Sequence, residues 1–185
     1  MDLNRSDAFE LLRTHTQNEN LVKHMLAVEA ALRAYALKFE EDETLWGITG
    51  LLHDFDYEKH PTPDEHPEVG IEILEGLGYP EALLHAIRAH APYLGVPRDS
   101  LLDRTLFACD ELAGFIVAVA LMRPSKSLTD LNVSSVTKKL KQAGFARAVS
   151  RDDIRVGAEE LGIDLNDHIA FVIEAMRGIS DDLGL

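Results

Sequence analysis

The feature that most constrains the fold is a run of apolar side chains that repeats with the period of an α-helix over residues 21–39. The stripe consists of Leu21, Met25, Val28, Leu32, Tyr35 and Phe39. Its members are separated by 4, 3, 4, 3 and 4 residues, so they share one face of a long helix. No segment rich in Val, Ile and Thr alternates with a period of two, as a half-buried strand would. We therefore predict an all-α fold.

Capping residues and prolines divide the rest of the chain into further helices. Asp7 with Glu10 has the spacing of a capping box that opens a short helix. Pro67 and Pro80 each stand where the first residue of a helix is expected. Helices are predicted over about 42–53, 67–77, 80–90, 101–122 and 133–143, and onward from the caps Ser150 and Asp164. The chain should form one helical bundle of about eight or nine helices.

The net charge of −14 argues against binding to a nucleic-acid polymer, because an acidic surface repels phosphates. The 123–155 segment differs, since it holds eight basic and three acidic residues and has a net charge of +5. Such a segment suits a small anion, or is simply a solvated helix face. We expect a small phosphorylated partner rather than DNA or RNA. The sequence leaves the oligomeric state open, and an oligomer is compatible with it.

Cellular location is inferred from the single cysteine and from the lack of long apolar runs. Cys109 cannot form a disulfide within the chain, which fits a reducing compartment. Residues 1–10 are charged and lack the apolar core of a signal peptide. The most apolar run, 112–122, has 11 residues, whereas a membrane span needs about 20. We expect a cytoplasmic protein without membrane segments.

The candidate functional residues are histidines and aspartates that lie at predicted helix ends or on predicted helices with an apolar flank. In chain order they are His24, His53, Asp54, His66, His90 and Asp110. Imidazole nitrogen binds Mn, Fe, Co, Ni or Zn, and a carboxylate adds charge and can bridge two ions. Asp110 lies in an apolar helix, where an unpaired carboxylate is costly, so it needs a partner such as a metal. Helical bundles build metal sites from facing helices in this way.

These residues lie in segments that resemble the HD-domain superfamily of metal-dependent phosphohydrolases and its HDIG-related members. The segments are KHMLAVEAALRAYA, GITGLLHDFDYEKHP, HPEVGIEILEGLGYP, LLHAIRAHA and LFACDELAGFIVAVALMRP. The resemblance implies one domain of the HD type over residues 1–185. Its metal-binding core would span about 20–125 and a C-terminal helical extension about 126–185.

The resemblance also implies a ligand set of six residues. His24, His53, Asp54 and Asp110 match the ligands of a primary metal. His66 and His90 match the histidines of dinuclear members, in which Asp54 would bridge the two ions. One or two divalent ions (Mn, Fe, Co, Ni, Zn or Mg) are therefore expected. The sequence reads HDFD instead of HDIG, which leaves Asp56 and Glu58 as acids that could support the ligands.

The leading hypothesis is that the protein is an enzyme that hydrolyses a phosphate ester in a nucleotide or another small compound. Asp54, His85 and Arg88 are the candidate catalytic residues, and Lys126 is a candidate for binding phosphate. A second hypothesis is a dinuclear-iron oxygenase built on the same six ligands. A third is a metal or nucleotide sensor without catalytic activity.

Each candidate also has a purely structural interpretation. His24 could be a histidine on a helix face, His53 and Asp54 could belong to a helix end and a loop, and Asp110 could form an ordinary hydrogen bond. His66 and His90 could be helix-end residues. His85 lies about 140° around a helix from His90, so both can hardly face one ion. The remaining histidines and Cys109 are expected on the surface or in the core: His15, His60, His168 and Cys109.

Overall fold

The computed structural model describes residues 3–185, and in this part of the chain it contains ten α-helices, a short 3-10 helix and no strand. The all-α prediction is therefore confirmed. The helices are α1 (Arg5–His15), α2 (Glu19–Phe39), α3 (Glu43–Leu52), α4 (Glu68–Gly76), α5 (Glu81–Ala89), η1 (Pro92–Leu94), α6 (Leu101–Leu121), α7 (Val133–Leu140), α8 (Arg151–Glu160), α9 (Leu165–Arg177) and α10 (Ser180–Leu183).

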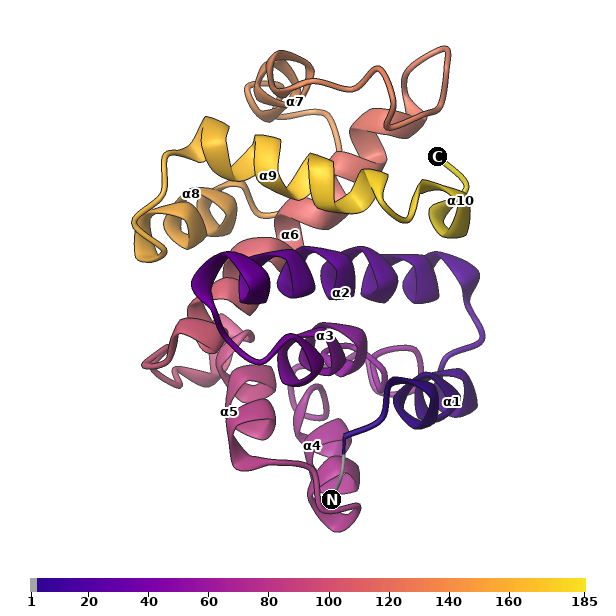
Figure 1. Ribbon diagram of the computed structural model, residues 1–185, viewed down its shortest axis with the longest axis vertical. Helices are drawn as coiled ribbons and strands as arrows, with labels where there is room; N and C mark the ends of the chain where they lie inside the picture. The colour runs from indigo at the N-terminus through magenta and orange to yellow at the C-terminus, as the bar shows by residue number, and fades with distance from the viewer. Residues whose placement is uncertain (1–2) are drawn as a thin grey trace.

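Helix α2 crosses the middle of the molecule (Figure 1). On one side lie α1, α3, α4 and α5, and on the other lie α7, α8, α9 and α10. The predicted apolar stripe explains this central position of α2. Its residues Met25, Val28, Leu32 and Tyr35 are fully buried, and α2 packs against α3, α6 and α9. Helix α3 approaches α2 closely at Gly50, where a Cβ atom would lie 3.0 Å from α2 backbone atoms.

Helix α6 is the second long apolar element and packs against α2, α5 and α8. A capping box starts it: the Asp103 N–H donates to Ser100 Oγ, and the Ser100 N–H donates to Asp103 Oδ2. Cys109, Phe115 and Ile116 are fully buried on its core faces. The placement of Cys109 in the core is therefore confirmed.

Several predicted helix boundaries need correction. The capping box of Asp7 and Glu10 is wrong, because α1 begins at Arg5 and Asn4 caps it through the backbone N–H groups of Ser6 and Asp7. Helix α7 ends at Leu140, three residues before the predicted end. The prolines at 67 and 80 occupy the caps of α4 and α5, one position before the first helical residue. The short α10 was not predicted.

The caps expected at three other helices are confirmed. Asp42 and Asp164 accept hydrogen bonds from backbone N–H groups in the first turns of α3 and α9. Ser150 Oγ accepts from the Asp153 N–H at the start of α8. Within residues 3–185, no helix is long and apolar enough to cross a membrane.

Candidate metal centre

The six candidate residues come from five helices and meet at one place. His24 lies on α2 and Asp110 on α6, and His53 caps the C-terminal end of α3 with Asp54 directly after it. The other two histidines lie at helix ends: His66 two residues before the start of α4, and His90 at the C-terminal cap of α5. His53 and His90 thus lie where α3 and α5 end, so the ends of these two helices determine where both histidines lie.

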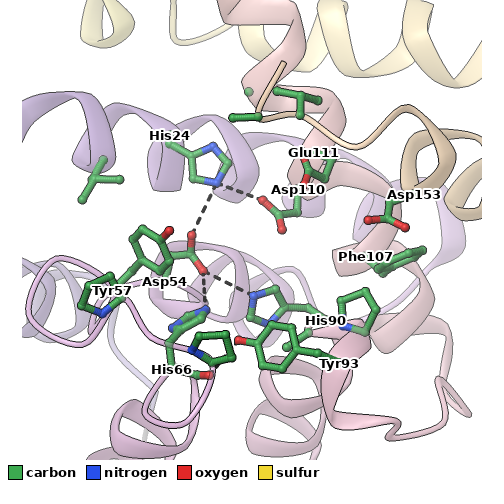
Figure 2. A pocket seen from close by; sticks show the side chains of 18 residues that line it. His24, Asp54, Tyr57, His66, His90, Tyr93, Phe107, Asp110, Glu111 and Asp153 are labelled. Carbon is green, nitrogen blue, oxygen red and sulfur yellow. Dashed lines mark hydrogen bonds and ion pairs between the residues drawn. The ribbon is translucent and has the colours of Figure 1, made fainter. Parts of the chain in front are cut away.

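The Asp54 carboxylate lies between two groups of histidines (Figure 2). Its Oδ1 atom is 3.2 Å from His66 Nε2 and 3.3 Å from His90 Nε2. Its Oδ2 atom is 3.9 Å from His24 Nε2. His53 Nε2 lies 3.6 Å from the same Oδ1 atom. The carboxylate therefore lies within reach of both groups of histidines, as a carboxylate shared by two ions would.

Asp110 lies on the other side of His24. Its Oδ1 atom is 3.0 Å from His24 Nε2 and 3.4 Å from His53 Nε2. Two donors bound to one ion at about 2.1 Å lie about 3.0–3.4 Å apart in octahedral or tetrahedral geometry. Four of the separations around Asp54 and Asp110, those of 3.0 to 3.4 Å, have this size, so the donor set fits a divalent metal.

Hydrogen bonds orient three of the imidazole rings. Nδ1 of His53 donates to the Gly50 carbonyl at 2.8 Å, and Nδ1 of His90 donates to the Ile87 carbonyl. Nδ1 of His66 donates to Asp56 Oδ1 at 2.8 Å. Because carbonyl and carboxylate oxygens can only accept, the proton of each neutral ring sits on Nδ1. This leaves the lone pair of Nε2 directed at the cluster, which is the form a metal ligand requires.

Burial and charge act in opposite directions on the imidazoles. Burial lowers the pKa of His66, but hydrogen bonds to Asp54 and Asp56 outweigh it and raise the pKa to about 9. The pKa values of His53 and His90 are also raised, because Asp54 and Asp110 outweigh the effect of burial. The cluster therefore has a strong affinity for positive charge, which protons supply when no metal is bound.

The two carboxyl groups show the converse effect. Burial opposes their ionisation, yet the histidines hold the pKa of Asp54 well below its usual range. The pKa of Asp110 is lowered in the same way by the neighbouring His24 and His53 imidazoles. Both groups are therefore carboxylates at neutral pH.

His53 provides the sharpest test of fit to a metal. Its side chain is fully buried, and Nε2 forms no hydrogen bond of acceptable geometry with any residue of the described chain. The Asp110 and Asp54 oxygens lie 3.4 Å and 3.6 Å away, but not in line for a hydrogen bond. A buried polar atom without a partner is costly, and an ion between these donors would remove that cost.

The cluster forms one wall of a cavity of about 550 Å³. Its lining includes residues that sequence reasoning did not select as functional: Tyr57, Tyr93, Phe107, Glu111 and Asp153 (Figure 2). Tyr57, Tyr93 and Glu111 lie within three residues of a candidate ligand, which could have indicated them. Asp153 comes from α8, far along the chain, and no local signal indicates it.

Two of these residues have perturbed ionisation. Burial and the neighbouring Asp110 carboxylate raise the pKa of Glu111 to about 7. Burial and Asp54 raise the pKa of Tyr93 to about 12, and its hydroxyl donates to the His66 carbonyl at 2.7 Å. Tyr93 therefore also holds the backbone of His66 in place.

The structure does not place His85, Arg88 or Lys126 in this cavity. His85 Nδ1 lies 3.1 Å from Asp103 Oδ2 at the start of α6. Arg88 binds both carboxylate oxygens of Glu68, at 2.9 Å and 3.1 Å. Lys126 is exposed in the loop after α6. The structure therefore does not bring these three residues together with the six candidate ligands, and their roles stay predictions.

The two acids that follow the HD pair have different roles. Asp56 is buried and supports the centre, because Oδ1 accepts from His66 and Oδ2 accepts from the Gly70 N–H at 2.9 Å. Glu58 points away and accepts from the Gln17 and Asn18 N–H groups at 2.7 Å and 2.9 Å.

The histidines that were not assigned to the site lie outside the cavity lining. His168 is buried, where Nε2 donates to the Ala108 carbonyl at 2.9 Å and Nδ1 accepts from the Tyr35 hydroxyl at 2.6 Å. His15 packs edge-on against Phe55. His60 lies 3.4 Å from a Glu65 oxygen.

Comparison with known proteins gives two matches. The family model described as "HD domain" matches residues 21–114, which include all six candidate ligands. The chain is similar to Ribonuclease Y of Lactobacillus acidophilus, with 26% identity over 159 residues. The match covers 83% of this chain and 29% of that protein, so the chain spans less than a third of its relative. No solved structure matches the chain.

Proposed function

The chain belongs to the HD domain family, and on this premise we propose that it is a metal-dependent phosphohydrolase acting on a nucleotide or another small phosphate ester. The observation that carries the proposal is the position of Asp54, whose carboxylate lies between the imidazoles of His24 and His53 and those of His66 and His90. The buried, unpartnered Nε2 atom of His53 supports it.

We assign the metal ligands as follows. One divalent ion would be held by His24, His53, Asp54 and Asp110. A second would be held by His66 and His90 together with Asp54. Ions of this kind supply Lewis acidity and lower the pKa of a bound water toward neutrality. The chain belongs to a family that contains metal-dependent hydrolases, and the Nδ1 hydrogen bonds of its histidines leave Nε2 as the atom that can bind a metal once it has released its proton.

The protein residues position the reactants. The Nδ1 hydrogen bonds of His53, His66 and His90 hold the rings so that the donors need no rearrangement. Asp54 and Asp110 stay ionised and balance the positive charge at the centre. The remaining walls of the cavity then hold the ester beside the centre, and such pre-positioning is a large part of catalysis.

A small ester is favoured over an RNA polymer. The name of the relative indicates RNA as its substrate, but this chain spans only 29% of that protein. The net charge is −14, and within the described chain no Lys or Arg lines the cavity. Binding to a nucleic-acid backbone relies on such residues.

The test is a substrate panel with the metal-free protein loaded in turn with Mn²⁺, Fe²⁺, Co²⁺, Ni²⁺, Zn²⁺ or Mg²⁺. Turnover of a phosphomonoester or phosphodiester is expected with at least one ion, and Asp54→Ala should lower it by about 100-fold or more. Asp167→Ala, an exposed aspartate on α9, serves as the control.

Three results would contradict the proposal. If Asp54→Ala matched the wild type, the catalytic centre would lie elsewhere. Iron-dependent O₂ consumption without hydrolysis would indicate the oxygenase. Tight nucleotide binding without turnover under any metal would indicate the sensor.

A further inference from the structure

The charge of the cavity wall is unusual for an enzyme that binds phosphate esters. Four carboxylates line it, and within the described chain no lysine or arginine does. The carboxylates are Asp54, Asp110, Glu111 and Asp153. If the metal centre takes Asp54 and Asp110, then Glu111 and Asp153 face the part of the substrate beyond the phosphoryl group.

Two arginines that contact or neighbour residues of this wall are held by other groups. Arg98 stacks on the ring of Phe107, with its guanidinium carbon 3.8 Å from the ring centroid. Its Nε and Nη2 atoms bind both oxygens of Glu160, at 2.6 Å and 2.7 Å. Arg151 donates to the backbone carbonyls of Phe145, Ala146 and Val149. Neither arginine is therefore free to neutralise a polyphosphate in the cavity.

Glu111 and Asp153 are brought to the same wall by the start of α8. The Ser150 N–H donates to Glu111 Oε2 at 3.3 Å, and Ser150 Oγ accepts from the Asp153 N–H at 3.2 Å. Asp153 lies near Phe107 on the side formed by α6 and α8 (Figure 2). Within residues 3–185, the Asp153 carboxylate has no ion-pair or side-chain hydrogen-bond partner.

Aromatic rings complete the wall. Phe107 lines the cavity beside Asp153, and Tyr57 and Tyr93 lie at its more exposed side. Carboxylates together with aromatic faces are the groups that bind alkylammonium ions, through charge and cation–π attraction. The unpartnered Nε2 of His53 indicates an ion at the adjacent metal centre, beside which the phosphoryl group of a substrate would lie.

We propose that the preferred substrate is a small phosphate monoester of an amino alcohol, with its ammonium group held by Glu111 and Asp153. This inference rests on the proposed phosphohydrolase function. The volume of about 550 Å³ suits a molecule of this size. In the reaction, phosphorus gains the oxygen of water, its bond to the alcohol oxygen breaks, and that oxygen takes a proton from the water. The products are inorganic phosphate and the amino alcohol.

The test compares two esters of the same shape, phosphocholine and 3,3-dimethylbutyl phosphate, of which only the first carries a positive charge. With the metal-loaded protein, kcat/KM should be at least about tenfold higher for phosphocholine, which is the effect of one modest charge interaction. AMP and ATP are measured in parallel and should be poorer substrates. Equal values for the two esters, or a preference for a nucleotide, would overturn the inference.

Variants test whether the two carboxylates cause the preference. Glu111→Gln and Asp153→Asn should each bring the ratio of the two kcat/KM values toward one. Asp152→Asn is the matched control, because it removes the same charge one residue away at a side chain that is 89% exposed and paired with Arg155. The control should keep the ratio. If both test variants also kept it, the assignment would be wrong.

The failure of this inference can be told apart from failure of the proposed function. Hydrolysis of both esters at equal rates removes only the preference for an ammonium group. If no ester is hydrolysed with any metal, calorimetric titration with the same two esters decides the inference. Tighter binding of phosphocholine would sustain it, and equal binding or no binding would reject it.

Discussion

Replacing Asp56 by Asn tests how the protein prepares His66 to bind a metal. Asp56 is buried and accepts two hydrogen bonds, one from His66 Nδ1 and one from the Gly70 N–H. Asparagine has the same shape but offers only one acceptor oxygen. If that oxygen serves the backbone of Gly70, the amide NH₂ faces Nδ1 of His66. The ring must then carry its proton on Nε2, which is the atom that faces Asp54.

The size of the effect follows from this change of tautomer. A ring with a proton on Nε2 cannot bind a metal through that atom until the proton moves. Loss of such a supporting hydrogen bond typically weakens metal binding by about 10- to 100-fold, or about 1.4–2.8 kcal/mol. The loss should fall on the ion assigned to His66 and His90. The ion assigned to His24 and Asp110 should bind nearly as in the wild type.

The assay is calorimetric titration of the metal-free protein with Mn²⁺ or Zn²⁺, with thermal melting as the check of folding. Glu58→Gln is the control, because it removes the same charge two residues away and contacts Gln17 and Asn18 instead of the centre. If Asp56→Asn bound both ions with affinities within twofold of the wild type, the argument from the tautomer would be refuted.

Three further predictions concern stability. In Gly157→Ala, the new Cβ would lie 2.6 Å from the Cα atom of Ala108, so the free energy of unfolding in urea should fall by about 1–3 kcal/mol. Gly76→Ala, where the space is open, should cause no loss, and equal stability of the two variants would contradict the packing argument. Burial lowers the pKa of His168, so only the unfolded chain takes up this proton as the pH falls below about 6.5. Its contribution to stability is therefore present above that pH and lost below it, by at most about 1.4 kcal/mol per pH unit, and His168→Gln should reduce the slope measured by urea unfolding. Finally, a divalent ion at 100 times its Kd should stabilise the fold by about 2.7 kcal/mol, visible as a higher Tm that EDTA reverses; His53→Ala should diminish the shift, and an undiminished shift would place the ion elsewhere.

The sequence predicted the helical architecture well because its main signals are local. The apolar stripe of α2 has one period over five turns, and the structure buries its central residues, such as Val28 and Leu32. The first residue of a helix was harder to predict where two residues could each act as its N-terminal cap. Asn4 and Asp7 are both good caps, and only the folded chain shows that α1 begins after Asn4.

The site was predictable to different degrees. The structure brings together the six residues that the resemblance picked out. His85 and Arg88 were candidate catalytic residues. Their side chains leave α5 in other directions, toward Asp103 and Glu68, and this depends on tertiary packing that a helical period alone does not specify.

The packing of α8 on α6 separates the residues proposed to bind the metal from one that is proposed to select the substrate. The family model ends at residue 114, and the six candidate ligands precede that point. Asp153 follows it and reaches the cavity because Gly157, without a side chain, lets α8 approach the backbone of Ala108. Helix α6 carries Asp110 toward the metal centre and Glu111 toward Ser150 on adjacent positions. A shift of α8 would therefore change which esters fit while leaving the six donors in place. Under the proposed function, the matched segment would supply the six ligands and Glu111, and the extension beyond it would add Asp153 to the part of the cavity that selects the substrate.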